Sequence, residues 1–292
     1  MPDYHPESPE RIGAITQQLI AENLLEQLVS YEAPMVTREQ LARVHTAEYI
    51  DTIWSNAPTE GYLYLDMDTS MGPGSLAAAQ RAAGAAVLAT ELVFEGKVSN
   101  AFCNIRPPGH HAGPDYAMGF CIFNNVAVGV MHAIAHYGLQ RVAIADFDVH
   151  HGNGTEEIFR NDPRVMLCST FQHPFYPHSG ADSSSDHMVN VPLPTGTGSD
   201  GFRAAVEDRW IPALEQFQPE MIFFSAGFDG HENDGMASLR LHEDDYAWVT
   251  QRIMEIADIY SKNRIVSLLE GGYALPVLGR SAAAHIRTLM RI

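Results

Sequence analysis

The stretch RVAIADFDVHHGNG, residues 141–154, joins a short apolar run to a loop of aspartates and histidines. Continuous apolar runs of this length are typical of strands in a parallel sheet that is covered on both faces. Comparable runs recur along the chain, separated by helical patterns, at residues 100–105, 164–170, 220–228 and 263–269, with a weaker one at 188–193. The alternation predicts the α/β class, with one domain over residues 1–292 and helices on both faces of a parallel sheet.

The spacing of apolar residues also predicts where helices begin and end. Helices are expected over residues 9–29 and 38–54, and a long buried helix is expected from Ser75 to a stop at Gly96. Pro212 lies inside another predicted helix and should kink it, because proline cannot donate the helical hydrogen bond. No apolar run approaches the roughly 20 residues that a membrane helix needs, so no membrane partner is expected.

Charge and cysteine content restrict the function further. The net charge of −18 disfavours nucleic acid as a partner, because phosphate binding needs clustered Lys and Arg, and it favours cationic molecules instead. The three cysteines form no C-x-x-C pair, and the polar start of the chain does not resemble a signal peptide. A reducing, cytoplasmic location is therefore expected.

Reactive residues gather where the predicted strands end. The strand ends read RPPGHHAG, DFDVHHGNG, CSTFQHPFYPHSG, SAGFDGHEND and LEGGYA in chain order. Ligands of open parallel sheets bind at the carboxyl ends of the strands, so these five segments should meet at one edge. The active site is expected there.

Three of these residues form a candidate metal site. Asp148 and His150 are two positions apart, so in extended backbone their side chains point the same way. Asp229 ends the apolar run at 220–228 and is the natural third ligand, leaving a fourth position open for water. Taken singly, a D-x-H pair is more often a turn, and a lone aspartate after a strand is more often a cap.

Two further groups are candidates for acid–base chemistry. The adjacent histidines His110 and His111 follow a stiff Pro-Pro-Gly segment, and a histidine pair near a metal suits proton transfer. Tyr273 follows Gly271 and Gly272, whose flexibility would let its hydroxyl reach a carbonyl that gains charge. The competing interpretations are two ordinary loop histidines and a buried core tyrosine.

Taken together, the motifs resemble the zinc-dependent histone deacetylase family. The matching segments occur in order, as RPPGHHA, GFCIFNN, DFDVHHGNGT, SAGFD and EGGY, and the likeness runs from HPESPER at His5 to the last predicted helix. The family also contains acetylpolyamine amidohydrolases, other bacterial amidohydrolases and acetoin-utilisation proteins. RPPGHHA and HHGNG are similar to its class II branch rather than to class I.

The resemblance implies a role for each matching residue. It implies one Zn²⁺ per chain, held by Asp148, His150 and Asp229. His111 would act as general base and then acid, with His110 as its electrostatic partner and Tyr273 as the stabiliser of the oxyanion. Asp146 would support His110, and Asn153 would support His111.

The resemblance also implies a structural cation and a substrate tunnel. A potassium site would use Asp146, Ser169 and Thr170 with the backbone of Asp148 and His150. The walls of an acyl-lysine tunnel would be Gly119, Phe120 and Tyr176. Asp68 would grip substrate backbone at the rim, and Arg11 would line an inner product channel. Met236 falls where polyamine-selective relatives carry a glutamate.

Two departures from the family pattern bear on these expectations. Family members usually have an opening strand before the HPESPER motif, so an edge strand is expected to be missing or supplied otherwise. Class I members have an aspartate where Asn153 stands, so the protonation of His111 is expected to differ from theirs.

The expected function is hydrolysis of an N-acetyl amide, most simply acetyl-lysine in a peptide, with an acetylated amine as the alternative substrate of an acetylpolyamine amidohydrolase. A non-catalytic acyl-lysine binder is disfavoured, because no ligand or catalytic residue of the pattern is missing. An arginase-like dinuclear manganese hydrolase would need extra bridging aspartates near His150 and Asp229. An oligomer stays possible.

Overall fold

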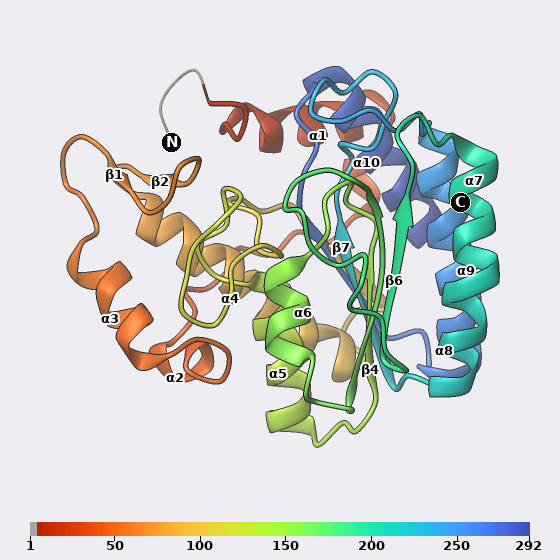
Figure 1. Ribbon diagram of the computed structural model, residues 1–292, viewed down its shortest axis with the longest axis horizontal. Helices are drawn as coiled ribbons and strands as arrows, with labels where there is room; N and C mark the ends of the chain where they lie inside the picture. Colours follow the sequence, from red (N-terminus) through yellow and green to blue (C-terminus); the bar gives the residue numbers. More distant parts are fainter. Residues whose placement is uncertain (1–4) are drawn as a thin grey trace.

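A six-stranded parallel sheet forms the centre of the computed structural model, which describes residues 5–292 (Figure 1). In spatial order its strands are β3 (Asn100–Cys103), β8 (Ile265–Leu269), β7 (Met221–Ala226), β4 (Val142–Asp146), β5 (Val165–Gln172) and β6 (Met188–Leu193). Every neighbouring pair runs parallel. The predicted strands are therefore confirmed, and β3 and β6 form the two edges.

Helices cover both faces of the sheet, as expected. Figure 1 shows α4–α6 on one side and α7–α10 on the other. The helices are α1 (Glu10–Ala21), α2 (Arg38–Leu41), α3 (Ala47–Ser55), α4 (Ser75–Phe94), α5 (Asn125–Tyr137), α6 (Asn153–Phe159), α7 (Ser199–Ala205), α8 (Ile211–Phe217), α9 (Glu243–Tyr260) and α10 (Leu275–Leu289). All residues of the central strands β4, β7 and β8 are buried, since each has a helical layer on either side.

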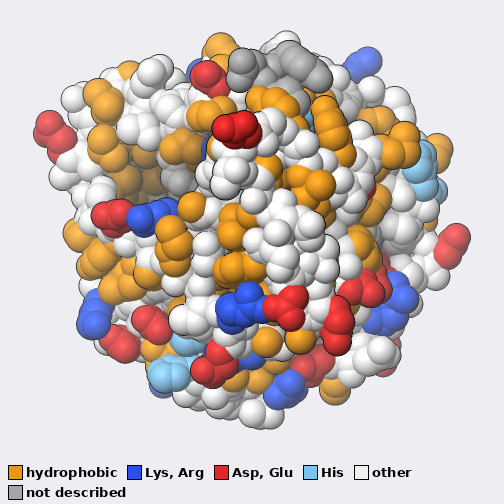
Figure 2. Space-filling view, turned by 90° about the vertical axis from the view of Figure 1, so that its left-hand side faces the viewer, with side chains coloured by type: hydrophobic (Ala, Val, Ile, Leu, Met, Phe, Trp, Pro, Cys, Tyr) orange, Lys and Arg blue, Asp and Glu red, His pale blue; other side chains and the backbone are white. Residues whose placement is uncertain are grey.

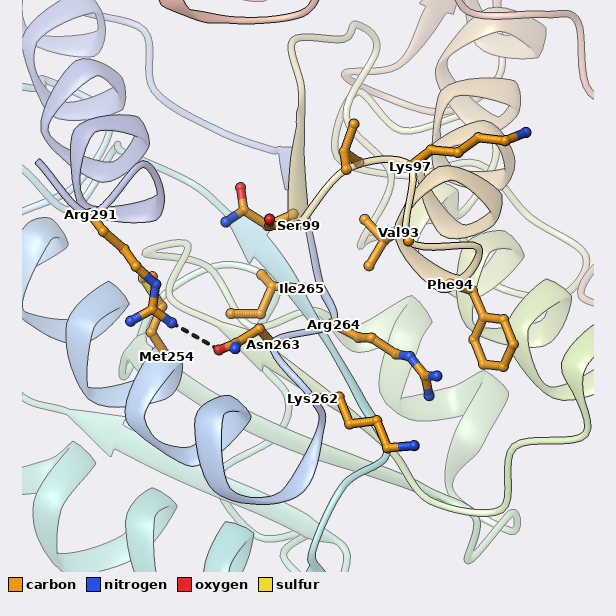
Figure 3. A pocket seen from close by; sticks show the side chains of 13 residues that line it. Val93, Phe94, Lys97, Ser99, Met254, Lys262, Asn263, Arg264, Ile265 and Arg291 are labelled. Carbon is orange, nitrogen blue, oxygen red and sulfur yellow. Dashed lines mark hydrogen bonds between the residues drawn. The ribbon is translucent and has the colours of Figure 1, made fainter.

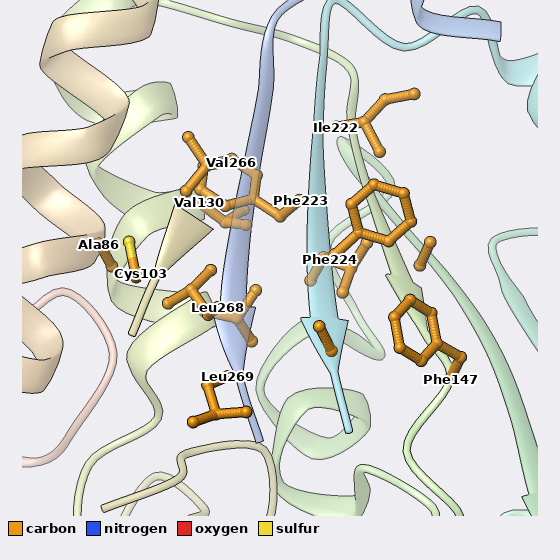
Figure 4. Close-up of a cluster of buried hydrophobic side chains, with 14 of the residues drawn as sticks. Ala86, Cys103, Val130, Phe147, Ile222, Phe223, Phe224, Val266, Leu268 and Leu269 are labelled. Atoms are coloured by element: carbon orange, nitrogen blue, oxygen red, sulfur yellow. The ribbon is translucent and has the colours of Figure 1, made fainter. Parts of the chain in front are cut away.

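The two halves of the core meet across β7 (Figure 4). Successive side chains of a strand point to opposite faces. Phe223 therefore packs toward α5, where a Cβ on Gly129 would lie 2.9 Å from its ring. Phe224 faces the other layer, with its ring centre 5.8 Å from that of Phe147. This double burial fixes the register that places the loops at the strand ends.

The first predicted helix is too long. The chain leaves the helix after Ala21, because Asn23 adopts a left-handed backbone conformation with φ of 56°. Leu24 is nevertheless buried, so apolar spacing continues past the helix end. The helix predicted over residues 38–54 is likewise two helices, α2 and α3, each capped by a threonine hydroxyl.

The helix that contains Pro212 is interrupted next to this residue, as predicted. A π-helical stretch, Val206–Trp210, separates α7 from α8, and Pro212 is the second residue of α8. A proline clashes with the carbonyl four residues earlier, and a π-helical turn accommodates that clash.

Helix α4 shows that one expectation from the sequence was wrong, namely that no apolar run is long enough to cross a membrane. It has 20 residues and is long and apolar enough to cross a membrane by length and composition. In the structure 61% of its most apolar window is buried, and it packs against α5 and β3. These contacts are those of a core helix, in which alanines allow close approach to the sheet.

A small hairpin lies beside the main sheet and was not predicted. Strands β1 (Leu63–Tyr64) and β2 (Ser70–Met71) pair antiparallel. Figure 2 shows the face of the molecule on this side, where hydrophobic side chains are spread widely and charged ones gather toward the lower edge. The hairpin exposes Tyr62, Tyr64 and Met67, the last one completely.

Candidate active site

The reactive segments meet at the carboxyl ends of the strands. The loops that follow β3, β4, β7 and β8 carry the two adjacent histidines, the Asp148–His150 pair, Asp229 and Tyr273. Strands β3, β8, β7 and β4 are consecutive neighbours in the sheet, so residues up to 163 positions apart lie within one site. The parallel topology alone explains this convergence.

Asp148, His150 and Asp229 form a buried cluster. Ligand atoms of the three side chains all lie within 4.8 Å of one another. Nδ1 of His150 lies 3.0 Å from Oδ1 of Asp148 and 3.2 Å from Oδ2 of Asp229. Burial opposes protonation of this ring, but the two carboxylates outweigh it and raise the pKa of His150 to about 10. The cluster therefore favours a positive charge between its two acidic groups.

Two glycines leave room for the cluster. A Cβ on Gly227 would lie 2.0 Å from Oδ2 of Asp148, and one on Gly271 would lie 2.1 Å from Oδ2 of Asp229. Oδ2 of Asp229 is buried, and beyond its ion pair with Nδ1 of His150 it has no hydrogen-bond partner among the described residues. A buried carboxylate oxygen without a partner is costly, and a cation at this point would satisfy it. Carboxylate oxygen and imidazole nitrogen are donors that Zn²⁺ accepts, so the residues fit a zinc ion.

The surroundings of His110 favour a positively charged ring. Its Nδ1 lies 3.0 Å from Oδ2 of Asp146, and its Nε2 lies 3.8 Å from Oδ1 of Asp148. Burial favours the neutral ring, but the carboxylates of Asp146, Asp148 and Glu270 prevail and raise the pKa of His110 well above its ordinary value. This ring is the cationic member of the pair.

The surroundings of His111 favour a neutral ring instead. Burial, reinforced by the positive charges of His110 and His150, lowers the pKa of His111 well below its ordinary value. Its Nδ1 lies 2.7 Å from Oδ1 of Asn153, an atom that can only accept. Nδ1 therefore carries the proton, and the lone pair is on Nε2. A neutral imidazole with a free Nε2 is suited to take a proton.

Tyr273 lies in the loop that leads from β8 to α10. Burial raises the pKa of its hydroxyl well above the ordinary value, so the group stays a hydrogen-bond donor. The guanidinium of Arg11 lies 4.8 Å from the centre of the Tyr273 ring, and the ring of Phe120 meets it edge-on at 5.8 Å. These contacts leave the tyrosine little freedom to swing.

Aromatic rings lie against the histidines of the site. Tyr176 meets His111 edge-on at 5.3 Å and His150 at 5.9 Å between ring centres. Gly119 has φ of 56°, and a Cβ there would lie 2.3 Å from the ring of His111. The residues predicted as tunnel walls thus lie against the catalytic candidates.

The remaining substrate candidates lie farther out. Burial and the charge of Asp68 raise the pKa of Tyr176, which places Asp68 near this ring. The backbone carbonyl of Asp68 lies 3.2 Å from Nε2 of His5. Met236 is half-buried in the loop after Asp229, and its N–H donates to Asp234. Arg11 is fully buried and donates to the carbonyls of Glu270 and Gly272, behind Tyr273.

The potassium ligand set stays a prediction. Asp146 and Ser169 are register partners on β4 and β5, and both are fully buried. Thr170 follows on β5 and is also buried. The Ser169 hydroxyl lies 3.2 Å from Nδ1 of His151.

The sequence interpretation missed two buried carboxylates. Glu270 accepts the N–H groups of Gly109 and His110, and burial outweighs the nearby positive charge of His110 and raises the pKa of Glu270 to about 7. Asp234 accepts the N–H groups of Tyr273 and Ala274. Both bind backbone groups far away in the chain, and their only signal in the sequence was a place within the segments EGGY and SAGFDGHEND.

A separate cavity of about 450 Å³ lies at the opposite end of the sheet, where β3 and β8 begin (Figure 3). Lys97, Lys262 and Arg291 on its lining follow the ends of α4, α9 and α10. Helix carboxyl ends carry partial negative charge, which these side chains offset. Arg264 lies 4.1 Å from the ring centre of Phe94. The basic lining is explained by the helix ends.

Fold and site together define a protein of the α/β class with a candidate metal centre at the carboxyl ends of its strands. The family model of the histone deacetylase domain matches residues 5–289. The chain belongs to the histone deacetylase family.

Known relatives agree with this assignment. The chain is 38% identical to a probable deacetylase of Archaeoglobus fulgidus, over 93% of this chain and 77% of that protein. It is also 38% identical to the histone deacetylase-like amidohydrolase of Pseudomonas aeruginosa, over 92% of this chain and 73% of that one. The crystal structure of the HDA15 HD domain superposes with a TM-score of 0.91 at 34% identity, covering 98% of this chain and 83% of that chain.

Proposed function

We propose that this chain is a zinc-dependent deacetylase that hydrolyses the acetylated side-chain amide of lysine in peptides or proteins. The proposal rests on two adjacent histidines, His110 and His111, whose surroundings shift their pKa values in opposite directions. They lie beside the buried cluster of Asp148, His150 and Asp229, which could hold a metal ion. His111 is neutral with a free Nε2, and His110 is cationic. Membership of a family of deacetylases and amidohydrolases rests on the match to the family model and to its relatives.

Asp148, His150 and Asp229 would hold the zinc ion. When bound, Zn²⁺ supplies Lewis-acid polarisation of the amide carbonyl and of the attacking water. Zinc is favoured over a hard cation such as Mg²⁺ because one of the three donors is an imidazole nitrogen.

The protein residues supply the proton transfers. Nε2 of His111 accepts a proton from the attacking water and later delivers it to the amine as the C–N bond breaks, which leaves acetate and the free lysine. The hydroxyl of Tyr273 stabilises the negative charge that develops on the carbonyl oxygen, and the cationic ring of His110 is the electrostatic partner of His111. Each group already has the protonation state that its role needs.

The tunnel walls favour a long apolar chain. Phe120 and Tyr176 present aromatic surface next to the catalytic candidates, and such surface buries an aliphatic stem that ends in a neutral amide. Acetyl-lysine has this composition.

An acetylpolyamine is the second candidate substrate. The net charge of −18 favours a cationic amine, whereas the apolar side chain of Met236 provides no charge to bind one. The ratio of kcat/KM on an acetyl-lysine peptide to that on N-acetylputrescine decides between them. A ratio above one supports the first substrate, and a ratio below one supports the second.

The proposed chemistry predicts the outcome of two substitutions. Tyr273→Phe removes the hydroxyl, and His111→Ala removes the base, so each should lower turnover of a fluorogenic acetyl-lysine peptide by about 100-fold or more. Tyr260→Phe on the outer helix α9 is the matched control and should keep full activity. Removal of metal by a chelator should abolish turnover, and added Zn²⁺ should restore it. Full activity in both site variants would overturn the mechanism.

A further inference from the structure

The peptide group between Gly272 and Tyr273 is held at both of its ends. Its carbonyl oxygen accepts a hydrogen bond from Nε of Arg11 at 2.7 Å. Its N–H donates to Oδ2 of Asp234 at 2.6 Å. Arg11 is fully buried and Asp234 nearly so, so both partners act away from solvent. Hydrogen bonds at opposite ends fix the plane of this peptide.

This peptide is the point at which Tyr273 would otherwise be free to move. Gly272 has φ of 117°, a conformation that glycine adopts easily and other residues rarely do. Rotation of the peptide plane beside this glycine would redirect the whole tyrosine side chain. The flexibility expected from the Gly271–Gly272 pair is therefore removed by groups from two other segments.

Asp234 is well suited to this task. Its Oδ2 also accepts the N–H of Ala274 at 3.0 Å, and its Oδ1 accepts the N–H of Met236 at 3.0 Å. Hydrogen bonds to a carboxylate are shorter and stronger than those between neutral groups. The carboxylate also lies at the amino end of α10, where the helix dipole favours negative charge.

Asp234 also joins two parts of the site. It belongs to the loop that begins at Asp229, one of the three cluster residues, and it grips the loop that carries Tyr273. A displacement of either loop is thereby transmitted to the other.

We propose that Asp234 is a positioning residue, which holds the Gly272–Tyr273 peptide so that the Tyr273 hydroxyl faces the substrate carbonyl. The inference rests on the proposed function, since it acts through the tyrosine that stabilises the oxyanion. Asp234 itself does not touch the reacting atoms.

Two variants of Asp234 test the proposal by kinetics. Asp234→Ala removes the two carboxylate oxygens that accept from backbone N–H groups. It should lower kcat by about 100-fold, the effect of misplacing a catalytic group by about 1 Å, while KM stays nearly unchanged. Asp234→Asn keeps an oxygen that can accept from Tyr273 and Ala274, and should recover most of kcat. Equal loss in both variants would overturn the proposal.

A double-substitution cycle separates positioning from general stability. In a Tyr273→Phe background, Asp234→Ala should lower kcat little further, because the hydroxyl that it positions is already gone. Additive losses would contradict the proposal. Asp245→Ala is the matched control, since Asp245 is a fully buried carboxylate that binds the backbone at the start of α9. It should lower the melting temperature but not kcat.

Amide hydrogen exchange tests the same contact without relying on catalysis. In the full-length protein, the peptide that contains residues 270–277 should exchange faster in Asp234→Ala than in the wild type or in Asp234→Asn. Unchanged exchange in Asp234→Ala would overturn the positioning role. An inactive wild-type protein with the expected exchange pattern would contradict the proposed function and leave the contact established.

Discussion

His110 and His111 are neighbours in the chain, yet different groups stand behind their rings. A carboxylate, Asp146, faces Nδ1 of His110, whereas an amide, Asn153, faces Nδ1 of His111. A neutral amide fixes the tautomer without attracting a proton. Asp146, together with Asp148 and Glu270, favours the cationic ring of His110, whereas burial and the charges of His110 and His150 keep the ring of His111 neutral.

Replacing the amide by an acid should shift the pH dependence of activity. In Asn153→Asp the new carboxylate raises the pKa of His111, which is lowered in the native protein by burial and by two nearby histidines. The base must be neutral to accept a proton, so activity is lost as the pH falls through its pKa. The acidic limb of the kcat/KM profile should therefore move to higher pH. An unmoved or lowered limb would contradict the role of His111 as base.

At the scale of elements, His285 joins α10 to α9 and to β8. Its Nδ1 lies 2.5 Å from the hydroxyl of Thr250, and its Nε2 lies 2.8 Å from that of Ser267. The Thr250 hydroxyl donates to the carbonyl of Tyr246, so it accepts from Nδ1 and the Ser267 hydroxyl donates to Nε2. The ring is fully buried and neutral, and burial lowers its pKa to about 3.

This buried histidine should contribute to acid instability. The unfolded chain binds a proton on it below about pH 6.5, whereas the native ring binds one only near pH 3. The free energy of unfolding should therefore fall as the pH is lowered from 6.5 toward 3. In His285→Gln, which cannot titrate, the slope should be shallower by up to about 1.4 kcal/mol per pH unit. Denaturant unfolding between pH 4 and 7 measures this, and identical slopes would contradict it.

The positions of helices and strands could be predicted where a run of residues is continuously buried. They were harder to predict where the backbone conformation of a single residue ends the element. The strands of the sheet follow directly from their apolar runs. The end of α1 does not, because apolar residues such as Leu24 continue the helical spacing beyond the left-handed Asn23. The β1–β2 hairpin has strands of only two residues, which are too short to show a period.

The sequence predicted those residues of the site that follow directly after strands of the parallel sheet. Asp148 and Asp229 were placed together because both follow strands of one parallel sheet, and the structure shows β4 and β7 side by side. Glu270 and Asp234 could not be predicted, because their partners are backbone N–H groups, and every residue except proline has one. Contacts of that kind leave no pattern in side-chain identity.

At the scale of the whole molecule, the net charge of −18 should increase the rate at which a cationic substrate associates with the protein. An acidic protein attracts cationic peptides over long distances, and salt screens this attraction. For an acetyl-lysine peptide flanked by lysines, kcat/KM should fall by about tenfold between 10 and 150 mM salt. The same peptide flanked by glutamines is the control and should show little change. Equal salt dependence of the two peptides would contradict electrostatic attraction.

The cluster of Asp148, His150 and Asp229 draws its members from the loops after β4 and β7, two strands that are neighbours in space but distant in the chain. During synthesis on the ribosome, a nascent chain that ends before Asp229 has only two of the three ligands. The tyrosine at position 273 emerges later still. A metal ion that needs all three residues would thus bind at the end of translation, when the sheet can close around residues that were made first.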